Sequence, residues 1–281
     1  MTDTVIEVDG LVKEFGSGRR AARVLDDIGF TVERGETLGL VGESGSGKST
    51  TARCILRLIE PTSGSIHFEG EDVLSFRRSK LKDYRSRAQL VFQDPYSSLD
   101  PRMRVEDIIA EGIRIHRPRE KREKVRDEIV ELLELVGLRP DHLPRRPAAF
   151  SGGERQRIGI ARALAVRPSL LICDEPVASL DVSIQAQILN LFVDLKARLG
   201  LTMIYIAHDL ATVRHLCDRV VVMQGGTIKE IGSRDEVYNA PRDPYTIALM
   251  QAVPEPDPVI ARQRFEQRRL AAAAAAEGAA P

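Results

Sequence analysis

The sequence has no tryptophan, only three cysteines and no net charge. Aromatic residues make up 5% of its 281 residues, so a binding face built on stacked aromatic rings is not expected. The 41 basic and 41 acidic side chains cancel, which argues against a protein that binds nucleic acid through bulk positive charge. We therefore predict no nucleic-acid partner.

The three cysteines, Cys54, Cys173 and Cys217, lie far apart and form no CxxC pair. Neither a disulfide framework nor a thiolate metal site is expected, and a reducing compartment fits this usage. The first residues lack a basic segment followed by an apolar one, so no signal peptide is predicted. No run approaches the roughly 18 apolar residues that a membrane span needs. We expect a cytoplasmic protein that works at a membrane only through a partner.

Short apolar runs alternate with segments of helical periodicity along most of the chain. This alternation predicts a parallel sheet covered by helices on both faces, with mostly helical structure inserted from about 94 to 166. A pair of N-terminal strands is expected at 5–15 and 24–36, and a hairpin at 65–73. The strands expected in the parallel sheet cover residues 37–41, 89–93, 170–175, 203–208 and 219–224.

The segment from Gly42 to Ser49 carries the strongest motif of the sequence. It follows the apolar run at 37–41, opens a helical stretch expected to end near Pro61, and fits the pattern GxxxxGK[ST]. Glycines let the backbone close around phosphate oxygens, and amides at a helix start point at the anion. Lys48 is expected to reach the β- and γ-phosphates, and Ser49 to bind magnesium. The predicted nucleotide-binding residues here are Gly42, Glu43, Ser44, Gly45, Ser46, Gly47, Lys48, Ser49 and Thr50.

Two adjacent acids, Asp174 and Glu175, end the apolar run that begins at 170. At the carboxyl end of a sheet strand, both carboxylates would lie beside the phosphate crevice. Asp174 is expected to hold the magnesium shell, and Glu175 to polarise the attacking water as a general base. A solvated turn after a strand is the simpler alternative for this pair taken alone.

The segment at 150–157, with the sequence FSGGERQR, resembles the signature segment of ABC-type ATPases. The fourth position of the core is usually Gln in that family and is Glu154 here. Ser151, Gly152, Gly153 and Glu154 open a predicted helix, so they offer a second anion-binding surface, although a capped helix start is the simpler alternative. In the family this surface of one copy closes over ATP held by the phosphate loop of another. The resemblance therefore implies a second ATPase subunit, either identical or a paralogue.

Four further residues fall where the resemblance places functional ones. It implies that Gln93 contacts magnesium and water and senses the membrane partner, and that Asp181 belongs to the loop that communicates between the two copies. It also implies that His208 lies near the γ-phosphate and that Phe15 stacks on adenine. Taken alone, each has a simpler interpretation: a strand-end Gln, a helix-capping Asp, a surface His and a core Phe.

The resemblance extends over residues 5–258 and implies a P-loop NTPase fold of the α/β class. This fold has a parallel-sheet core, an N-terminal antiparallel β subdomain and an inserted helical subdomain. We expect the ATPase domain at 5–252, with the helical insertion at about 94–166. Residues 253–281 are expected to form a C-terminal extension with a disordered, alanine-rich tail.

Within the family, the segments 41–53, 92–103 and 150–164 look most like importers of oligopeptides, dipeptides or nickel. Residues 238–258 are similar to the extension that these subunits carry. The resemblance implies ATP hydrolysis with Mg²⁺. It also implies transmembrane permease subunits as partners, and an extracytoplasmic solute-binding protein that interacts with this chain only indirectly. The implied location is peripheral, on the cytoplasmic face of the inner membrane. Some members bind an iron–sulfur cluster after the core; no cysteine follows Cys217, so no cluster is expected.

Three alternatives use the same ATPase chemistry. The transported solute could be nickel or another small molecule, or the chain could serve an exporter. A soluble ATP-gated clamp on nucleic acid or ribosomes is the third, but such proteins tend to carry long coiled coils, zinc elements or tandem ATPase copies. This chain has one copy and no long heptad run.

Overall fold

A six-stranded sheet forms the centre of the molecule in the computed structural model, which describes residues 3–16, 18, 21–208 and 210–252. The strand order is β10-β9-β3-β8-β7-β6, and the five strands from β9 to β6 are parallel. β10 pairs with β9 in the antiparallel direction and was not predicted from the sequence. The strands are β3 (Thr37–Val41), β6 (Ala88–Val91), β7 (Leu170–Asp174), β8 (Thr202–Ala207), β9 (Arg219–Gln224) and β10 (Thr227–Ser233).

Every residue of β3, β7 and β8 is buried, as expected for strands covered on both faces. Along β7, Leu171 and Cys173 enter one hydrophobic core and Leu170 and Ile172 enter the other, because successive side chains point to opposite faces. The first core includes α6 (Val182–Leu199) and α7 (Leu210–Leu216), and the second includes α1 (Lys48–Ile55). Because these strands are packed on both faces, they hold in place the loops that follow their carboxyl ends.

Around the parallel sheet, two expected elements end at least two residues earlier in the structure. The strand expected at 89–93 is β6, which ends at Val91, so Gln93 lies beyond the strand. The helix expected to run toward Pro61 ends at Ile55, because Arg57 takes a left-handed conformation with φ of 49° that a helix cannot continue. Both corrections concern ends of elements, where periodicity carries little information.

A second, antiparallel sheet has the order β2-β1-β4-β5. It consists of β1 (Thr4–Phe15), β2 (Ala22–Glu33), β4 (Ser63–Phe68) and β5 (Glu71–Asp72). These correspond to the two predicted strands and the hairpin, except that β2 ends at Glu33, three residues before its expected end. Its buried side chains, such as Val8 and Ile66, join α1 in the second core. This sheet therefore packs against the helix that follows the glycine-rich loop.

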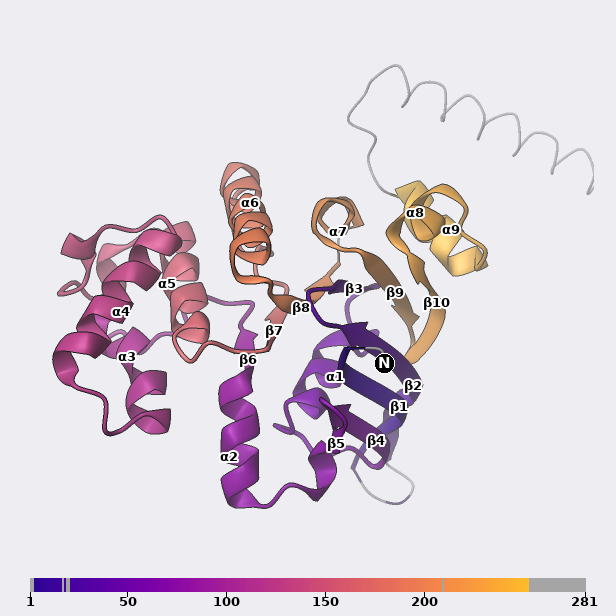
Figure 1. The fold of residues 1–281 in the computed structure, drawn as a ribbon. Coiled ribbons are helices and arrows are strands. Elements are labelled where there is room, and N and C mark those ends of the chain that lie inside the picture. Colours follow the sequence, from indigo (N-terminus) through magenta and orange to yellow (C-terminus); the bar gives the residue numbers. More distant parts are fainter. Residues whose placement is uncertain (1–2, 17, 19–20, 209, 253–281) are drawn as a thin grey trace, which may run out of the picture.

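The remaining helices form two groups. Between β6 and β7, α3 (Val105–His116), α4 (Arg122–Leu135) and α5 (Gly152–Leu164) lie at one side of the parallel sheet, away from β1 and β2 (Figure 1). They occupy the predicted insertion, and α2 (Arg78–Arg87) precedes it. After β10 come α8 (Arg234–Asn239) and α9 (Pro244–Ala252). The tail expected at 253–281 lies outside the described residues. No helix in the described part of the chain has the length and apolar character that a bilayer crossing requires.

Candidate active site

The glycine-rich loop connects β3 to α1 at the carboxyl edge of the parallel sheet. Gly42 has a φ of 150°, and a Cβ there would lie 2.1 Å from the backbone oxygen of Met223, so no other residue fits without a backbone shift. Gly47 caps α1 with a φ of 105° and provides no side-chain hydrogen bond to the first turn. The amides at the start of α1 are therefore left for an anion.

Lys48, the first residue of α1, lies under this loop with only 4% of its surface exposed. Its Nζ donates hydrogen bonds to the carbonyl oxygens of Gly42 at 2.7 Å and Glu43 at 2.8 Å. Burial lowers the pKa of Lys48, and the carboxylates of Glu175 and Asp174 oppose this effect. The loop therefore holds a desolvated cation between backbone carbonyls, where phosphate oxygens would be stronger partners.

Ser49 and Asp174 meet although 125 residues separate them. Ser49 Oγ donates a hydrogen bond to Asp174 Oδ1 at 2.7 Å, at the point where β7 ends beside α1. Burial raises the pKa of Asp174, while the hydrogen bond from Ser49 and the charge of Arg53 oppose the rise. Two oxygen atoms that can act as ligands of a hard divalent cation thus lie together beside the phosphate loop.

Glu175 follows β7 in a left-handed backbone conformation, with a φ of 45°. Its N–H donates to the carbonyl oxygen of Ile206 at 3.1 Å, which holds this uncommon geometry. Its carboxylate accepts a hydrogen bond from Gln93 Nε2 at 3.2 Å, lies 3.5 Å from Nδ1 of His208, and lies 4.0 Å from Lys48 Nζ. The structure therefore gathers the three residues expected to be catalytic, Glu175, Gln93 and His208, beside Lys48, which is expected to bind the phosphates.

A small hollow of about 30 Å³ adjoins this group and is lined in part by Glu175 and His208. A water molecule needs roughly 10–15 Å³ of such space when polar partners are present. Glu175 thus borders a space in which a water molecule fits. A carboxylate held beside Gln93, His208 and Lys48 can accept a proton from a water molecule that approaches it.

The segment from Ser151 to Glu154 opens α5 and forms a capping box. The Ser151 hydroxyl accepts a hydrogen bond from the Glu154 N–H at 3.3 Å, and Glu154 Oε2 accepts from Ser151 N–H and Oγ at 2.9 Å each. The hydrogen bond from the Ser151 backbone is the main reason that the pKa of Glu154 is lowered. The unusual fourth residue of the segment is therefore an ionised carboxylate at a helix N-terminus, where negative charge is stabilised.

This second segment packs on α6 rather than on the phosphate loop of its own chain. A Cβ at Gly153 would lie 2.5 Å from Cγ2 of Ile184, and one at Gly152 would lie 3.1 Å from Cδ2 of Leu180. Asp181 is the N-cap of α6, is exposed, and makes no side-chain capping hydrogen bond. The structure thus places Ser151–Glu154 near Asp181, as a group separate from the one around Lys48 and Glu175.

The remaining predicted residues lie at the edges of these groups. Phe15 ends β1 with 41% of its surface exposed, and Lys13 Nζ lies 4.9 Å from the centre of its ring. It belongs to the antiparallel sheet and is not a core residue.

Thr50 is half-buried in the first turn of α1. Ser44 and Gly45 are exposed at the tip of the loop, whereas Ser46 is buried.

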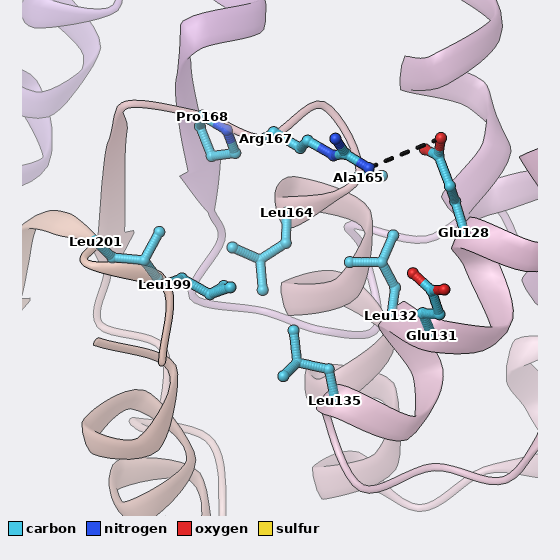
Figure 2. A pocket seen from close by; sticks show the side chains of 10 residues that line it. All are labelled: Glu128, Glu131, Leu132, Leu135, Leu164, Ala165, Arg167, Pro168, Leu199 and Leu201. Carbon is cyan, nitrogen blue, oxygen red and sulfur yellow. Dashed lines mark ion pairs between the residues drawn. The ribbon is translucent and has the colours of Figure 1, made fainter. Parts of the chain in front are cut away.

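A larger hollow of about 560 Å³ lies elsewhere, between α4, the end of α5 and the turn after α6. Figure 2 shows leucine side chains from these elements converging on it, with Arg167 and Glu128 at its rim, 3.8 Å apart. None of the predicted phosphate-binding or catalytic residues lines this hollow. It is therefore not the site that the motifs describe.

Tyr245 of α9 was not predicted from the sequence to approach the phosphate loop. Its hydroxyl oxygen accepts a hydrogen bond from the Glu43 N–H at 3.2 Å. These residues lie 202 positions apart, and no local pattern signals such a contact. The one hint is that Tyr245 belongs to the segment 238–258, which resembles an extension found in some ABC subunits.

Two family profiles match the chain. The profile described as ABC transporter matches residues 25–178, and the profile described as oligopeptide/dipeptide transporter, C-terminal region, matches residues 229–279. The first match spans the glycine-rich loop, the signature-like segment and the pair Asp174–Glu175. The second includes α9 and continues past the described residues.

Curated relatives resemble the chain over most of its length. The oligopeptide transport ATP-binding protein OppF of Bacillus subtilis (strain 168) is 49% identical over 95% of this chain and 88% of that protein. The dipeptide transport ATP-binding protein DppF of Lactococcus lactis subsp. cremoris (strain MG1363) is 49% identical over 92% of this chain and 84% of that protein.

Solved structures resemble the fold. The structure of cbiO1 from Clostridium perfringens, part of the ABC transporter complex cbiONQ, has a TM-score of 0.75 and 28% identity and covers 85% of this chain and 92% of its own. The ATP-binding cassette MJ0796, in a dimeric post-hydrolysis state bound to ADP and Pi, has a TM-score of 0.74 and 26% identity. That match covers 82% of this chain and 98% of the cassette.

Proposed function

Since this chain belongs to the ABC transporter family, we propose that the two groups of residues described above bind and hydrolyse ATP for a peptide importer. The chain is an ATPase subunit, and its relatives are oligopeptide and dipeptide transport ATP-binding proteins. The observation that carries the residue assignment is the convergence of Lys48, Ser49, Asp174 and Glu175 at one edge of the sheet.

ATP binding begins at the phosphate loop. Lys48 exchanges the carbonyl oxygens of Gly42 and Glu43 for phosphate oxygens, which are charged and form stronger hydrogen bonds. The free amides at the start of α1 supply further donors to the phosphates. Phe15, exposed at the end of β1, is the proposed contact for adenine.

The residues present fit a magnesium ion. Ser49 Oγ and Asp174 Oδ1 are adjacent oxygen donors, and Gln93 is the third proposed ligand. Among residues 3–16, 18, 21–208 and 210–252, no cluster of three His, Cys, Asp or Glu residues could hold a metal alone. This agrees with an ion that takes its other ligands from substrate phosphates and water. When bound, the ion neutralises negative charge on the phosphates.

Glu175 is the proposed general base. Glu175 borders the water-sized hollow, and Gln93 and His208 contact the same oxygen of its carboxylate, Oε2. These two contacts hold the carboxylate in one orientation, so that it can accept a proton from a water molecule that attacks the γ-phosphate. His208 is 58% exposed on its side chain, which leaves it accessible to the substrate.

Ser151, Gly152, Gly153 and Glu154 are proposed to close over ATP held by a second ATPase subunit. They form a separate group from the phosphate loop of their own chain, so one chain carries two incomplete half-sites. Asp181, beside this group, is the proposed contact between the subunits. The second subunit is another copy of this chain or a paralogue.

The proposed partners are transmembrane permease subunits, since the chain belongs to the ABC transporter family and its relatives are transport ATP-binding proteins. The permease contact would lie near Gln93, where Phe92 and Tyr96 are exposed. An extracytoplasmic solute-binding protein would act on the permease and reach this chain only indirectly. We place the subunit on the cytoplasmic face of the inner membrane as a peripheral protein.

Reconstitution of the chain with its permease and second ATPase subunit in vesicles tests the transport function. We expect ATP turnover to rise severalfold when oligopeptides or dipeptides are supplied with the solute-binding protein. The measurement is phosphate release at fixed ATP with peptides, nickel ions or no solute. Stimulation by nickel alone, or by peptides on the cytoplasmic side without the binding protein, would contradict peptide import.

The ionised carboxylate of Glu154 yields a prediction about ATP-driven association. Its negative charge lies against Ser151 Oγ, on the surface proposed to close over ATP, so it opposes ATP binding. Glutamine at this position retains an acceptor for the capping box without the charge. We expect Glu154→Gln to lower the ATP concentration for half-maximal dimerisation about three- to tenfold, or about 1 kcal/mol, as for a solvent-screened charge pair.

The chain offers a matched control for this substitution. Glu236 forms the same capping box with Ser233 at the start of α8, with Oε2 accepting from both Ser233 N–H and Oγ. Glu236→Gln should leave the ATP dependence of dimerisation unchanged. If Glu154→Gln needed the same ATP concentration as the unaltered protein for half-maximal dimerisation, or a higher one, the charge of Glu154 would not oppose the phosphates.

A further inference from the structure

The phosphate loop is held on one side by α9, through the hydrogen bond from the Glu43 N–H to the Tyr245 hydroxyl. The bonded N–H belongs to the peptide unit that joins Gly42 to Glu43. The carbonyl oxygen of the same unit, on Gly42, accepts a hydrogen bond from Lys48 Nζ at 2.7 Å. In a trans peptide these two groups point in opposite directions. Before ATP binds, the unit is therefore clamped between Tyr245 and Lys48.

Tyr245 is itself fixed in place by the turn that precedes α9. The N–H groups of Arg242 and Asp243 donate to the Glu230 carboxylate on β10, at 3.0 and 3.1 Å. The Tyr245 N–H in turn donates to Asp243 Oδ1 at 2.8 Å. The Tyr245 ring also packs against the first hydrophobic core. The hydroxyl thus approaches the loop from a well-anchored position.

The consequence for the loop follows from this geometry. Rotation of the Gly42–Glu43 peptide would break the bond to Tyr245 and turn the Gly42 oxygen away from Lys48. Without the Tyr245 hydroxyl, this peptide has more freedom before ATP binds, and the binding of ATP must then restrict it. A loop that is already ordered loses less conformational entropy on binding.

We propose that Tyr245 is a positioning residue for ATP: its hydroxyl orients the Gly42–Glu43 peptide and so couples the C-terminal helix α9 to the phosphate loop. The proposal rests on the function proposed above, because it needs ATP at this loop. Displacement of α9 by a partner or by the following segment would weaken ATP binding. Glu175 and its contacts with Gln93 and His208 do not include α9, so the chemical step is not affected.

The test is Tyr245→Phe in the full-length chain, assembled with its permease. Removal of one hydroxyl is expected to raise the KM for ATP about three- to tenfold, the range of one hydrogen bond, and to leave kcat within about twofold. The exchange of the Glu43 amide hydrogen, measured without nucleotide, is expected to become faster. The exchange rate of this amide reports on its hydrogen bond to Tyr245, and it can be measured even if the variant does not assemble with the permease.

Thr246→Val is the matched control, since it also removes one hydroxyl from α9. Thr246 is buried, and its Oγ1 has no hydrogen-bond partner among the residues that the structure describes. This variant should keep the KM of the unaltered protein. An unchanged KM and unchanged Glu43 exchange in Tyr245→Phe, or an equal rise in KM in Thr246→Val, would overturn the proposal. Absence of ATP turnover in the unaltered complex would instead contradict the proposed function.

Discussion

Replacement of Glu175 by glutamine is expected to lower ATP turnover by at least about 100-fold, the lower range for loss of a general base, and to preserve ATP binding. Glutamine is nearly isosteric and can keep contacts with Gln93 and His208, but it cannot take a proton from water at neutral pH. Binding is preserved because the phosphate loop and Lys48 are unchanged. The measurements are phosphate release at saturating ATP and equilibrium ATP binding on the same preparation.

Glu128→Gln is a suitable control for this variant. Glu128 is a partly buried glutamate with a basic partner, as Glu175 is, and bonds Arg117 at 2.6 Å. It lies at the rim of the hollow in Figure 2, away from the phosphate loop. We expect some loss of stability in this control and no loss of turnover. Near-normal turnover in Glu175→Gln would remove Glu175 from the role of base.

Replacement of Lys48 by alanine is expected to weaken ATP binding by about 100-fold, in the range for loss of one buried, charged hydrogen-bonding partner. Lys48 is 4% exposed, and its Nζ is the only buried cationic group that bonds the phosphate loop in the part of the chain that the structure describes. The measurement is the dissociation constant for ATP, by calorimetry or a fluorescent analogue.

Lys196→Ala serves as the control for Lys48→Ala. Lys196 is a partly buried lysine on α6 that bonds Asp218 at 2.5 Å, at the edge of the first core. Its loss removes a comparable charge from the protein without touching the loop. Equal ATP affinity in the unaltered protein and Lys48→Ala would contradict the phosphate-loop assignment.

The sequence predicted the parts of the fold that depend on local patterns. The buried strands β3, β7, β8 and β9 are apolar runs of strand length, and the loop after β3 needs glycine because its backbone packs against Met223. The placement of Ser49 beside Asp174 followed from the rule that parallel strands end at one edge of a sheet.

Other features depend on tertiary contacts that no local pattern encodes. The left-handed backbone of Glu175 is held by Ile206, a residue on the neighbouring strand β8. The contact between Tyr245 and Glu43 joins residues 202 positions apart, and the antiparallel strand β10 is only half-buried and weakly patterned. The capping box of Ser151 and Glu154 is, by contrast, a local Ser-x-x-Glu pattern, and it matches the capped helix start that the sequence offered as an alternative.

The most direct test of the account is the mass of the Glu175→Gln variant in solution with and without ATP, measured by sedimentation. With ATP, the account predicts particles of two ATPase subunits, in which one chain of 31.2 kDa pairs with a copy or a paralogue. Without ATP, it predicts single subunits. Single subunits at saturating ATP, with the permease and any paralogue supplied, would contradict the claim that two subunits enclose the nucleotide.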